Sequence, residues 1–201
     1  MSTLRELGCT AEVTGYLICT DNMPSGTATG LGDVITLRGG TTMEMIDTDA
    51  EGRVILADGL VLADEDGHDA VIDIATLTGS ALRALGTDMA AIIGSDDAVI
   101  EQIKAAAVAT DEGVWQMPLH KAYRSKIDSS VADIANCAPI GQPDMLLAGL
   151  FLSEFAGDTP WGHIDMCGTA QIDAATTWRP EGCSGYGTRL LVQLALDFAP
   201  P

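Results

Sequence analysis

One short stretch limits the architecture of this chain more than any other. Residues 70–75 (Ala-Val-Ile-Asp-Ile-Ala) form a nearly continuous apolar run of strand length. An apolar strand without polar alternation is typical of a sheet that is covered on both faces. We therefore expect the rest of the chain to supply helices for both sides of such a sheet.

Other apolar runs alternate between strand-like and helical patterns along the chain. Strands are predicted at residues 12–20, 34–37, 42–46, 90–93 and 163–166. Helices are predicted at residues 50–63, 98–109, 145–155 and 187–196, with a further helical segment after residues 76–80. Strands that alternate with helices predict an α/β layered fold with helices on both faces of the sheet. With 201 residues and no repeat or linker-like segment, a single domain over residues 1–201 is expected.

The charge balance is strongly acidic. Ten basic residues stand against 29 acidic ones, which gives a net charge of -19. This charge repels phosphate backbones and anionic lipids over roughly 8 to 10 Å, so neither nucleic acid nor a membrane is an expected partner. No run of about 18 apolar residues and no signal-peptide core occurs, so a cytoplasmic location is predicted. Five scattered cysteines without a CxxC pair are predicted to be reduced thiols, and three scattered histidines show no HExxH spacing.

Residues 47–53 (Asp-Thr-Asp-Ala-Glu-Gly-Arg) place three carboxylates at alternate positions ahead of an arginine. Hard divalent cations bind such oxygens, and alternate side chains share one face if the segment is extended. One interpretation is a partial metal site for metal-assisted hydrolysis. The other is a capping box, in which Thr48 and Glu51 open the helix that follows. The two can coexist, with Thr48 as cap while Asp49 and Glu51 bind.

This acidic heptapeptide and several other segments resemble the leucyl (cytosol) aminopeptidases. The matching segments keep the family's order from about residue 10 to residue 196, and they are 21–26, 47–53, 73–79, 160–165 and 185–191. The resemblance implies a three-layer αβα fold with a mixed central sheet. It also implies a metallo-exopeptidase that removes N-terminal residues, often leucine, from peptides with the help of two divalent cations, commonly zinc, manganese or magnesium. Members of the family assemble as homo-oligomers, namely hexamers.

The resemblance assigns roles to five residues. Carried over by position, Asp49 is a ligand of one metal, Glu51 bridges both metals, and Arg53 is the catalytic arginine that holds a bicarbonate as proton shuttle. A guanidinium suits a planar anion, and two cations lower the pKa of a shared water. Leu77 and Gly79 match positions whose backbone groups contact the peptide substrate. A turn followed by a helix start explains these last two residues nearly as well.

The chain also departs from the family pattern. Asp47 stands where the family usually has Asn, and residues 141–144 (Gly-Gln-Pro-Asp) lack the usual glycine-rich pattern. The family's lysine ligand, two further aspartate ligands and a second catalytic lysine precede the matched part, and this chain has no lysine before Lys104. We therefore expect an N-terminally truncated catalytic domain with part of the site, weak or no metal binding and no activity by itself. The alternative is a non-catalytic paralogue or split subunit that acts as an assembly or regulatory module.

Overall fold

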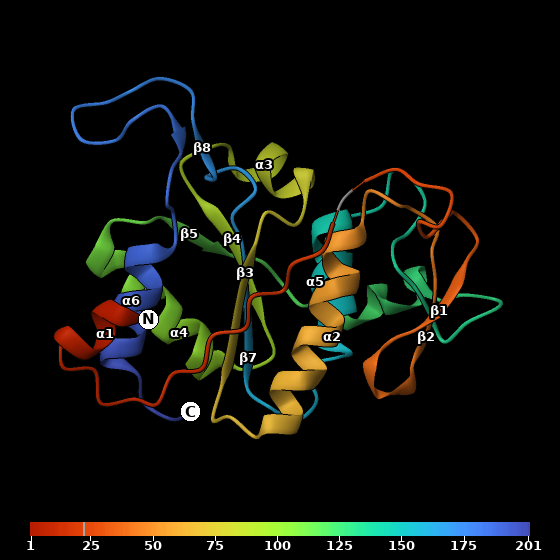
Figure 1. Ribbon diagram of the computed structural model, residues 1–201, viewed down its shortest axis with the longest axis horizontal. Helices are drawn as coiled ribbons and strands as arrows, with labels where there is room; N and C mark the ends of the chain where they lie inside the picture. The colour runs from red at the N-terminus through yellow and green to blue at the C-terminus, as the bar shows by residue number, and fades with distance from the viewer. Residues whose placement is uncertain (22) are drawn as a thin grey trace.

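A four-stranded mixed sheet forms the centre of the chain in the computed structural model, which describes residues 1–21 and 23–201 (Figure 1). The strand order is β3-β7-β4-β5. β3 and β7 are parallel, β4 is antiparallel to β7, and β5 is parallel to β4. The strands are β3 (Val71–Ala75), β4 (Ala90–Gly94), β5 (Val114–Gln116) and β7 (Trp161–Asp165).

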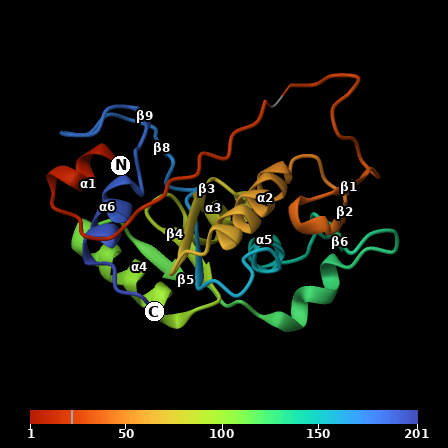
Figure 2. The ribbon, with the colours of Figure 1, turned by 60° about the horizontal axis from the view of Figure 1, so that its bottom comes forward.

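Helices cover both faces of this sheet, as Figures 1 and 2 show. One face carries α4 (Asp97–Thr110) and α6 (Thr188–Asp197), and the other carries α2 (Glu51–Asp66), α3 (Gly79–Leu85) and α5 (Asp144–Ser153). Strand β4 shows the two-sided burial directly, because Ala90 and Ile92 join the core under α4 while Ala91 and Ile93 join the core under α2 and α5. Successive side chains of a strand point to opposite faces. The predicted three-layer αβα fold is confirmed.

A second, smaller sheet lies beside α2 and α5 (Figure 1). Its order is β1-β2-β6, with an antiparallel hairpin of the first two strands and a parallel pair of the last two. β2 leads directly into the acidic heptapeptide and α2, which confirms the predicted order of strand, acidic segment and helix. The elements are β1 (Val34–Thr36), the 3-10 turn η1 (Arg38–Gly40), β2 (Thr42–Glu44) and β6 (Ile134–Ala135).

Like β5 and β6, four further elements were not predicted as such. Helix α1 (Ser2–Glu6) opens the chain, and the 3-10 helix η2 (Lys121–Ile127) packs against α5. β8 (Gln171–Ile172) and β9 (Gly182–Cys183) form a two-stranded antiparallel pair that leads into α6.

The strand predicted at residues 12–20 is wrong. The segment joins no strand ladder of the described residues and runs as a strap between α6 and α2 (Figure 1). At one end Cys9 Sγ donates to the Ala195 carbonyl at 3.2 Å, and further on Ile18 packs against Gly59 of α2. A β-branched composition favours a strand only where a partner edge and burial exist, and most side chains of the strap are exposed. The predicted loop at residues 21–26 includes Asn22, which lies outside the described residues.

Candidate functional site

The carboxyl ends of β3 and β7 meet at one edge of the central sheet. The two strands are parallel and in register, from Val71 opposite Trp161 to Ala75 opposite Asp165. The loop of residues 76–78 leaves β3 at this edge and leads into α3. Ligand sites in α/β sheets gather at the carboxyl ends of strands. This edge is therefore where the sequence-predicted residues should come together.

Asp165 fixes the loop after β3. Its carboxylate is 2% exposed and accepts the backbone N–H groups of Leu77 and Thr78 at 3.1 and 3.3 Å. The Thr78 hydroxyl donates to the same carboxylate at 2.6 Å and caps α3 by accepting the Ala81 N–H at 3.1 Å. The Leu77 amide is thus used inside the protein. A substrate contact at this residue would have to come from its carbonyl or its side chain.

The structure places Leu77 against the acidic heptapeptide but leaves Gly79 further out. A Cβ on Gly52, in the first turn of α2, would lie 3.3 Å from Leu77 Cδ1, so the two segments are in contact. Gly79 is exposed and forms the first residue of α3. Of the two predicted substrate-binding residues, Leu77 is the one that adjoins the predicted catalytic segment.

The acidic heptapeptide is not extended. Thr48 and Asp49 form a turn, and Asp47 Oδ1 stabilises it by accepting the Asp49 N–H at 2.9 Å. An aspartate that accepts the amide two residues on forms an Asx turn. The alternation that would put three carboxylates on one face therefore does not apply. The capping-box interpretation is also wrong, because Ala50 is the N-cap of α2 and no side chain caps it.

The two predicted metal ligands lie on either side of the start of α2. Asp49 is exposed, and Glu51 is the partly buried first residue of the helix, where the dipole favours a carboxylate. In residues 1–21 and 23–201, no group of three or more His, Cys, Asp or Glu side chains is placed to hold a metal ion. Two cations each want about four to six donors. The residues present do not fit a complete two-metal centre and can supply only part of its ligands.

Arg53 is the most deeply placed of the predicted residues, at 2% exposure. Its Nη2 forms an ion pair with Asp144 Oδ1 at 2.9 Å, and its Nη1 donates to the Asn136 carbonyl at 3.3 Å. Its Nε is buried without a hydrogen-bond partner among the described residues. The guanidinium is thus held from two sides, while its Nε has no partner in the described part of the chain.

Asn136 connects the smaller sheet to the acidic heptapeptide. It follows β6 and is fully buried. Its Oδ1 accepts the N–H groups of Ile46 and Asp47 at 2.9 and 3.2 Å, and its Nδ2 donates to the Asp47 carbonyl at 2.6 Å. This amide fixes the backbone that enters the acidic turn. Sequence reasoning missed it, because an isolated asparagine carries no signal of such a role.

Asp144 is the second residue that sequence reasoning missed. It is the first residue of α5, and besides Arg53 it accepts the Ser80 hydroxyl on Oδ2 at 3.2 Å. Its side chain is 40% exposed. An acidic residue at a helix start is already explained by the helix dipole, so its position offered no reason to pair it with Arg53. Asp144 brings α2, α3 and α5 together at the site.

A buried histidine lies deeper on the same face of the sheet. His163 Nδ1 pairs with Asp73 Oδ1 at 2.5 Å, and Asp73 Oδ2 accepts the Trp161 indole N–H at 2.7 Å. Burial lowers the pKa of His163, but the charge and hydrogen bond of Asp73 and the charge of Asp165 outweigh it, so the pKa is raised. His163 Nε2 is buried without a partner among the described residues.

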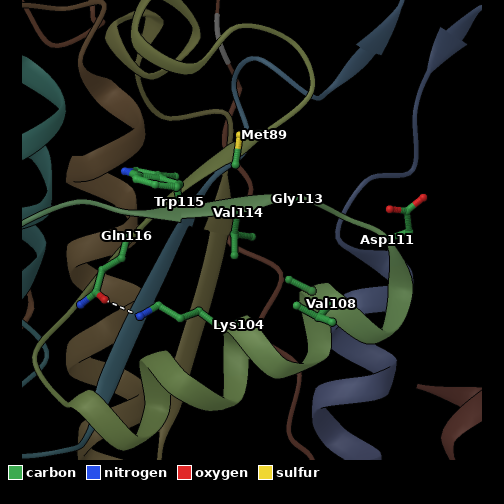
Figure 3. Close-up of a pocket in the computed structure, with 9 residues that line it drawn as sticks. Met89, Lys104, Val108, Asp111, Gly113, Val114, Trp115 and Gln116 are labelled. Carbon is green, nitrogen blue, oxygen red and sulfur yellow. Dashed lines mark hydrogen bonds between the residues drawn. The ribbon is translucent and has the colours of Figure 1, made fainter.

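One pocket lies away from this edge, against β5 (Figure 3). It has a volume of about 650 Å³ and is lined in part by Lys104, Val108 and Trp115. Lys104 Nζ donates to Gln116 Oε1 at 2.6 Å at its rim. The pocket contains none of the predicted site residues, so it does not bear on their chemistry.

Comparison with known proteins agrees with the resemblance seen in the sequence. Residues 1–192 match the model of the "Cytosol aminopeptidase family, catalytic domain". The protein named "Probable cytosol aminopeptidase" from Leifsonia xyli subsp. xyli is 48% identical over 199 residues, which cover 94% of this chain and 40% of the relative. Its namesake from Azotobacter vinelandii is 42% identical over 200 residues, 98% of this chain and 39% of the relative.

A "Cytosol aminopeptidase" from Pseudomonas aeruginosa is 41% identical over 196 residues, 96% of this chain and 38% of the relative. The chain thus spans about two fifths of the length of these curated relatives. No helix in the described part of the chain is long and apolar enough to cross a membrane. The chain belongs to the cytosol aminopeptidase family.

Proposed function

We propose that this chain contributes part of the active site of a metal-dependent aminopeptidase that releases N-terminal residues of the leucine type from peptides. The observation that carries the proposal is the contact between two predicted segments. Leu77, in the loop after β3, packs against the first turn of α2, which bears Glu51 and Arg53. A loop suited to a peptide and a carboxylate and arginine suited to hydrolysis thus share one edge of the sheet.

Each predicted residue has a distinct part in this proposal. Asp49 and Glu51 would be ligands of a pair of divalent cations such as manganese, zinc or magnesium. When bound, such cations supply an activated water. The remaining donors would come from polypeptide outside this sequence, since the chain spans only about two fifths of its relatives. Arg53 would stabilise negative charge beside the cations, with bicarbonate as one candidate anion. Asp165 would hold the loop of Leu77 in position for the substrate.

A fusion with a relative tests the proposal. The part of the Leifsonia xyli protein that this chain does not match would be joined to it, and release of leucine p-nitroanilide would be measured with and without added manganese. We expect metal-dependent hydrolysis in the fusion and a loss of at least about 100-fold in Asp49→Asn or Glu51→Gln, because each removes a metal ligand. Asp97→Asn, at the exposed start of α4, is the control and should leave the rate unchanged.

A folded fusion that binds manganese but shows no hydrolysis would contradict the proposal. It would instead fit the alternative of a non-catalytic assembly or regulatory module. Family membership also supports a homo-oligomer, hexameric in the family, and a cytoplasmic location as parts of the proposal. Sedimentation velocity of the fusion measures the first of these, and a monomer at micromolar concentration would contradict it.

A further inference from the structure

Strand β5 leaves one edge of the central sheet open. Among the described residues it pairs with β4 alone, in a parallel ladder. The Gly113 carbonyl and the Met117 N–H bond to β4, at 3.0 and 2.8 Å. Successive residues of a strand turn their main-chain groups to opposite edges, so Val114 and Gln116 present their N–H and C=O groups to the open side. Such a row of main-chain groups is a template for another strand.

Apolar side chains gather along this open edge. The pocket of about 650 Å³ runs beside it, and Figure 3 shows Val114 pointing toward α4 while Trp115 lies on the opposite side of the strand. Trp115 is 59% exposed, and Val108 of α4, which also lines the pocket, is 84% exposed. Exposed apolar side chains that cluster beside an unpaired strand mark a surface for association.

We propose that β5 pairs in antiparallel fashion with β5 of a second copy of this chain, about a twofold axis at Trp115. Val114 then lies opposite Gln116 of the other copy. Because both residues face the open side, each such pair exchanges two main-chain hydrogen bonds. The two Trp115 residues form the non-hydrogen-bonded pair between them, in which side chains approach most closely. The two central sheets thereby become one continuous sheet.

The charges of α4 fit this twofold arrangement. Lys104 lies beside one end of β5, where its Nζ donates to Gln116 Oε1 at 2.6 Å, and Asp111 lies at the other end of the pocket (Figure 3). A twofold axis at Trp115 exchanges the two ends, so Lys104 of each copy faces Asp111 of the other. Complementary charges favour one orientation of a complex. They also offset the general repulsion between two copies of net charge -19.

A second copy is the occupant that this edge suits best. The two outward-facing residues are each other's partners under the twofold axis, and so are the two charges. An isologous contact of this kind closes after two copies and leaves no edge for further growth. The strand has three residues, so the interface is small and a reversible dimer is expected. The proposal names a surface that the proposed function leaves open, and it does not depend on hydrolysis.

Sedimentation equilibrium of the full chain tests the proposal. The chain would be measured from about 10 to 500 µM, a range suited to a small interface, in about 150 mM salt, which screens distant charges. We expect a monomer–dimer equilibrium that Gln116→Pro weakens at least ten-fold, because proline removes an outward N–H that the ladder to β4 does not use. Gln116→Ala is the matched control, since it removes the same side chain but keeps the N–H, and it should still form the dimer.

A charge reversal tests the orientation without altering the main chain. Lys104→Glu places a carboxylate opposite Asp111 of the other copy and should weaken the dimer at least ten-fold. Lys126→Glu, at an exposed position of η2, makes the same change in net charge and is the control. It should leave the dimer unchanged. If Gln116→Pro does not fold, this pair of variants still decides the outcome.

A disulfide tests the register. In a background of Cys19→Ser and Cys183→Ser, which removes the exposed native thiols, Trp115→Cys should form a covalent dimer on mild oxidation. Residues that face each other in a non-hydrogen-bonded antiparallel pair have the separation that a disulfide requires. Val131→Cys, at a position of 64% exposure, is the control and should remain monomeric on a denaturing gel.

A monomer at every concentration would overturn the proposal. So would a dimer that Gln116→Pro and Lys104→Glu leave unchanged, which would indicate another surface. Association is measured on the chain itself without metal, so its failure is distinguishable from that of the aminopeptidase proposal, which rests on hydrolysis by the fusion.

Discussion

The two faces of the central sheet use different kinds of residues. Under α4 and α6 the core is apolar, and it includes Ile92 and Ile164 of the sheet and Ile100 and Ile103 of α4. Under α2 and α5 the strands contribute Asp73, His163 and Asp165, all on the same side as the buried indole of Trp161. Both faces thus bury apolar surface, and the face under α2 and α5 also carries strand charges that only hydrogen bonds and ion pairs make tolerable.

Within the described residues, the buried side-chain nitrogens that lack a hydrogen-bond partner lie on the face under α2 and α5, which we call the polar face. Among the described residues, the buried side-chain nitrogens without a partner are Arg53 Nε and His163 Nε2. Nearly all buried polar groups in proteins are satisfied, so exceptions call for an explanation such as a ligand or a catalytic role. The comparison teaches that apolar burial stabilises both faces, whereas the polar groups suited to chemistry gather on one. Substitutions on the two faces should therefore have different signatures.

The largest effect is expected from the apolar face. Ile103 is fully buried, and a Cβ on Gly162 of β7 would come within 2.8 Å of its Cδ1, so it packs directly on the sheet. Ile103→Ala should lower the free energy of unfolding by about 3 to 4 kcal/mol in urea denaturation. Val108→Ala on the same helix, at 84% exposure, is the control and should change stability by less than about 0.5 kcal/mol.

A loss below about 1 kcal/mol for Ile103→Ala would contradict the close packing of this side chain between α4 and the sheet.

The next largest effect on stability comes from the buried pair of Asp73 and His163, and it depends on pH. Because the pKa of His163 is raised in the folded chain, its protonated form stabilises the fold. This contribution is fully present below the unfolded pKa of about 6.5 and is lost as pH rises through the raised folded pKa. Asp73→Asn should therefore lower the free energy of unfolding by about 2 kcal/mol at pH 5.5. This loss is smaller than is typical when one partner of a buried ion pair is removed, because the imidazole can release its proton.

A double-mutant cycle between Asp73→Asn and His163→Asn checks this effect. The coupling between the two sites should be larger at pH 5.5 than at pH 9. A coupling that is equal at the two pH values would show that the hydrogen bond alone, without charge, holds the pair.

The smallest effect is local to the loop after β3. Thr78→Val keeps the shape of the side chain but removes the hydroxyl that bonds Asp165 and caps α3. A loss of about 1.5 kcal/mol is expected from a lost cap and a lost charged hydrogen bond. Amide exchange of Leu77 should accelerate, because its acceptor on Asp165 is no longer held. Thr76→Val, at an exposed position of the same loop, is the control, and equal exchange in both variants would refute the anchoring role of Thr78.

Local pattern was sufficient to predict much of the fold. The strand at residues 71–75 and the helix at residues 97–110 carry their own apolar periodicity, so sequence alone located them within one or two residues. Strands β5 and β6 have three and two residues and exist only through their partners, which no local window contains. The strap at residues 12–20 shows the opposite error, in which strand-like composition lacks a partner edge.

The candidate site was predictable only in part, for the same reason. Asp49, Glu51 and Arg53 lie at alternate positions of one short motif that is recognisable in the sequence, and their metal and catalytic roles remain predictions. The partner of Arg53 lies 91 residues away at Asp144. Its identity follows from the packing of α2 against α5, which a motif does not encode.

The clamp formed by Asn136 has a consequence for the order of folding. Its bonds to Ile46 and Asp47 span 90 and 89 residues of sequence. Contacts so distant in sequence carry a large loop-closure cost and form late relative to local helices. During synthesis, the acidic turn cannot adopt its final shape until residue 136 has emerged and docked. The timing of site formation is therefore set by the smaller sheet, well after the helix that bears Arg53 can form.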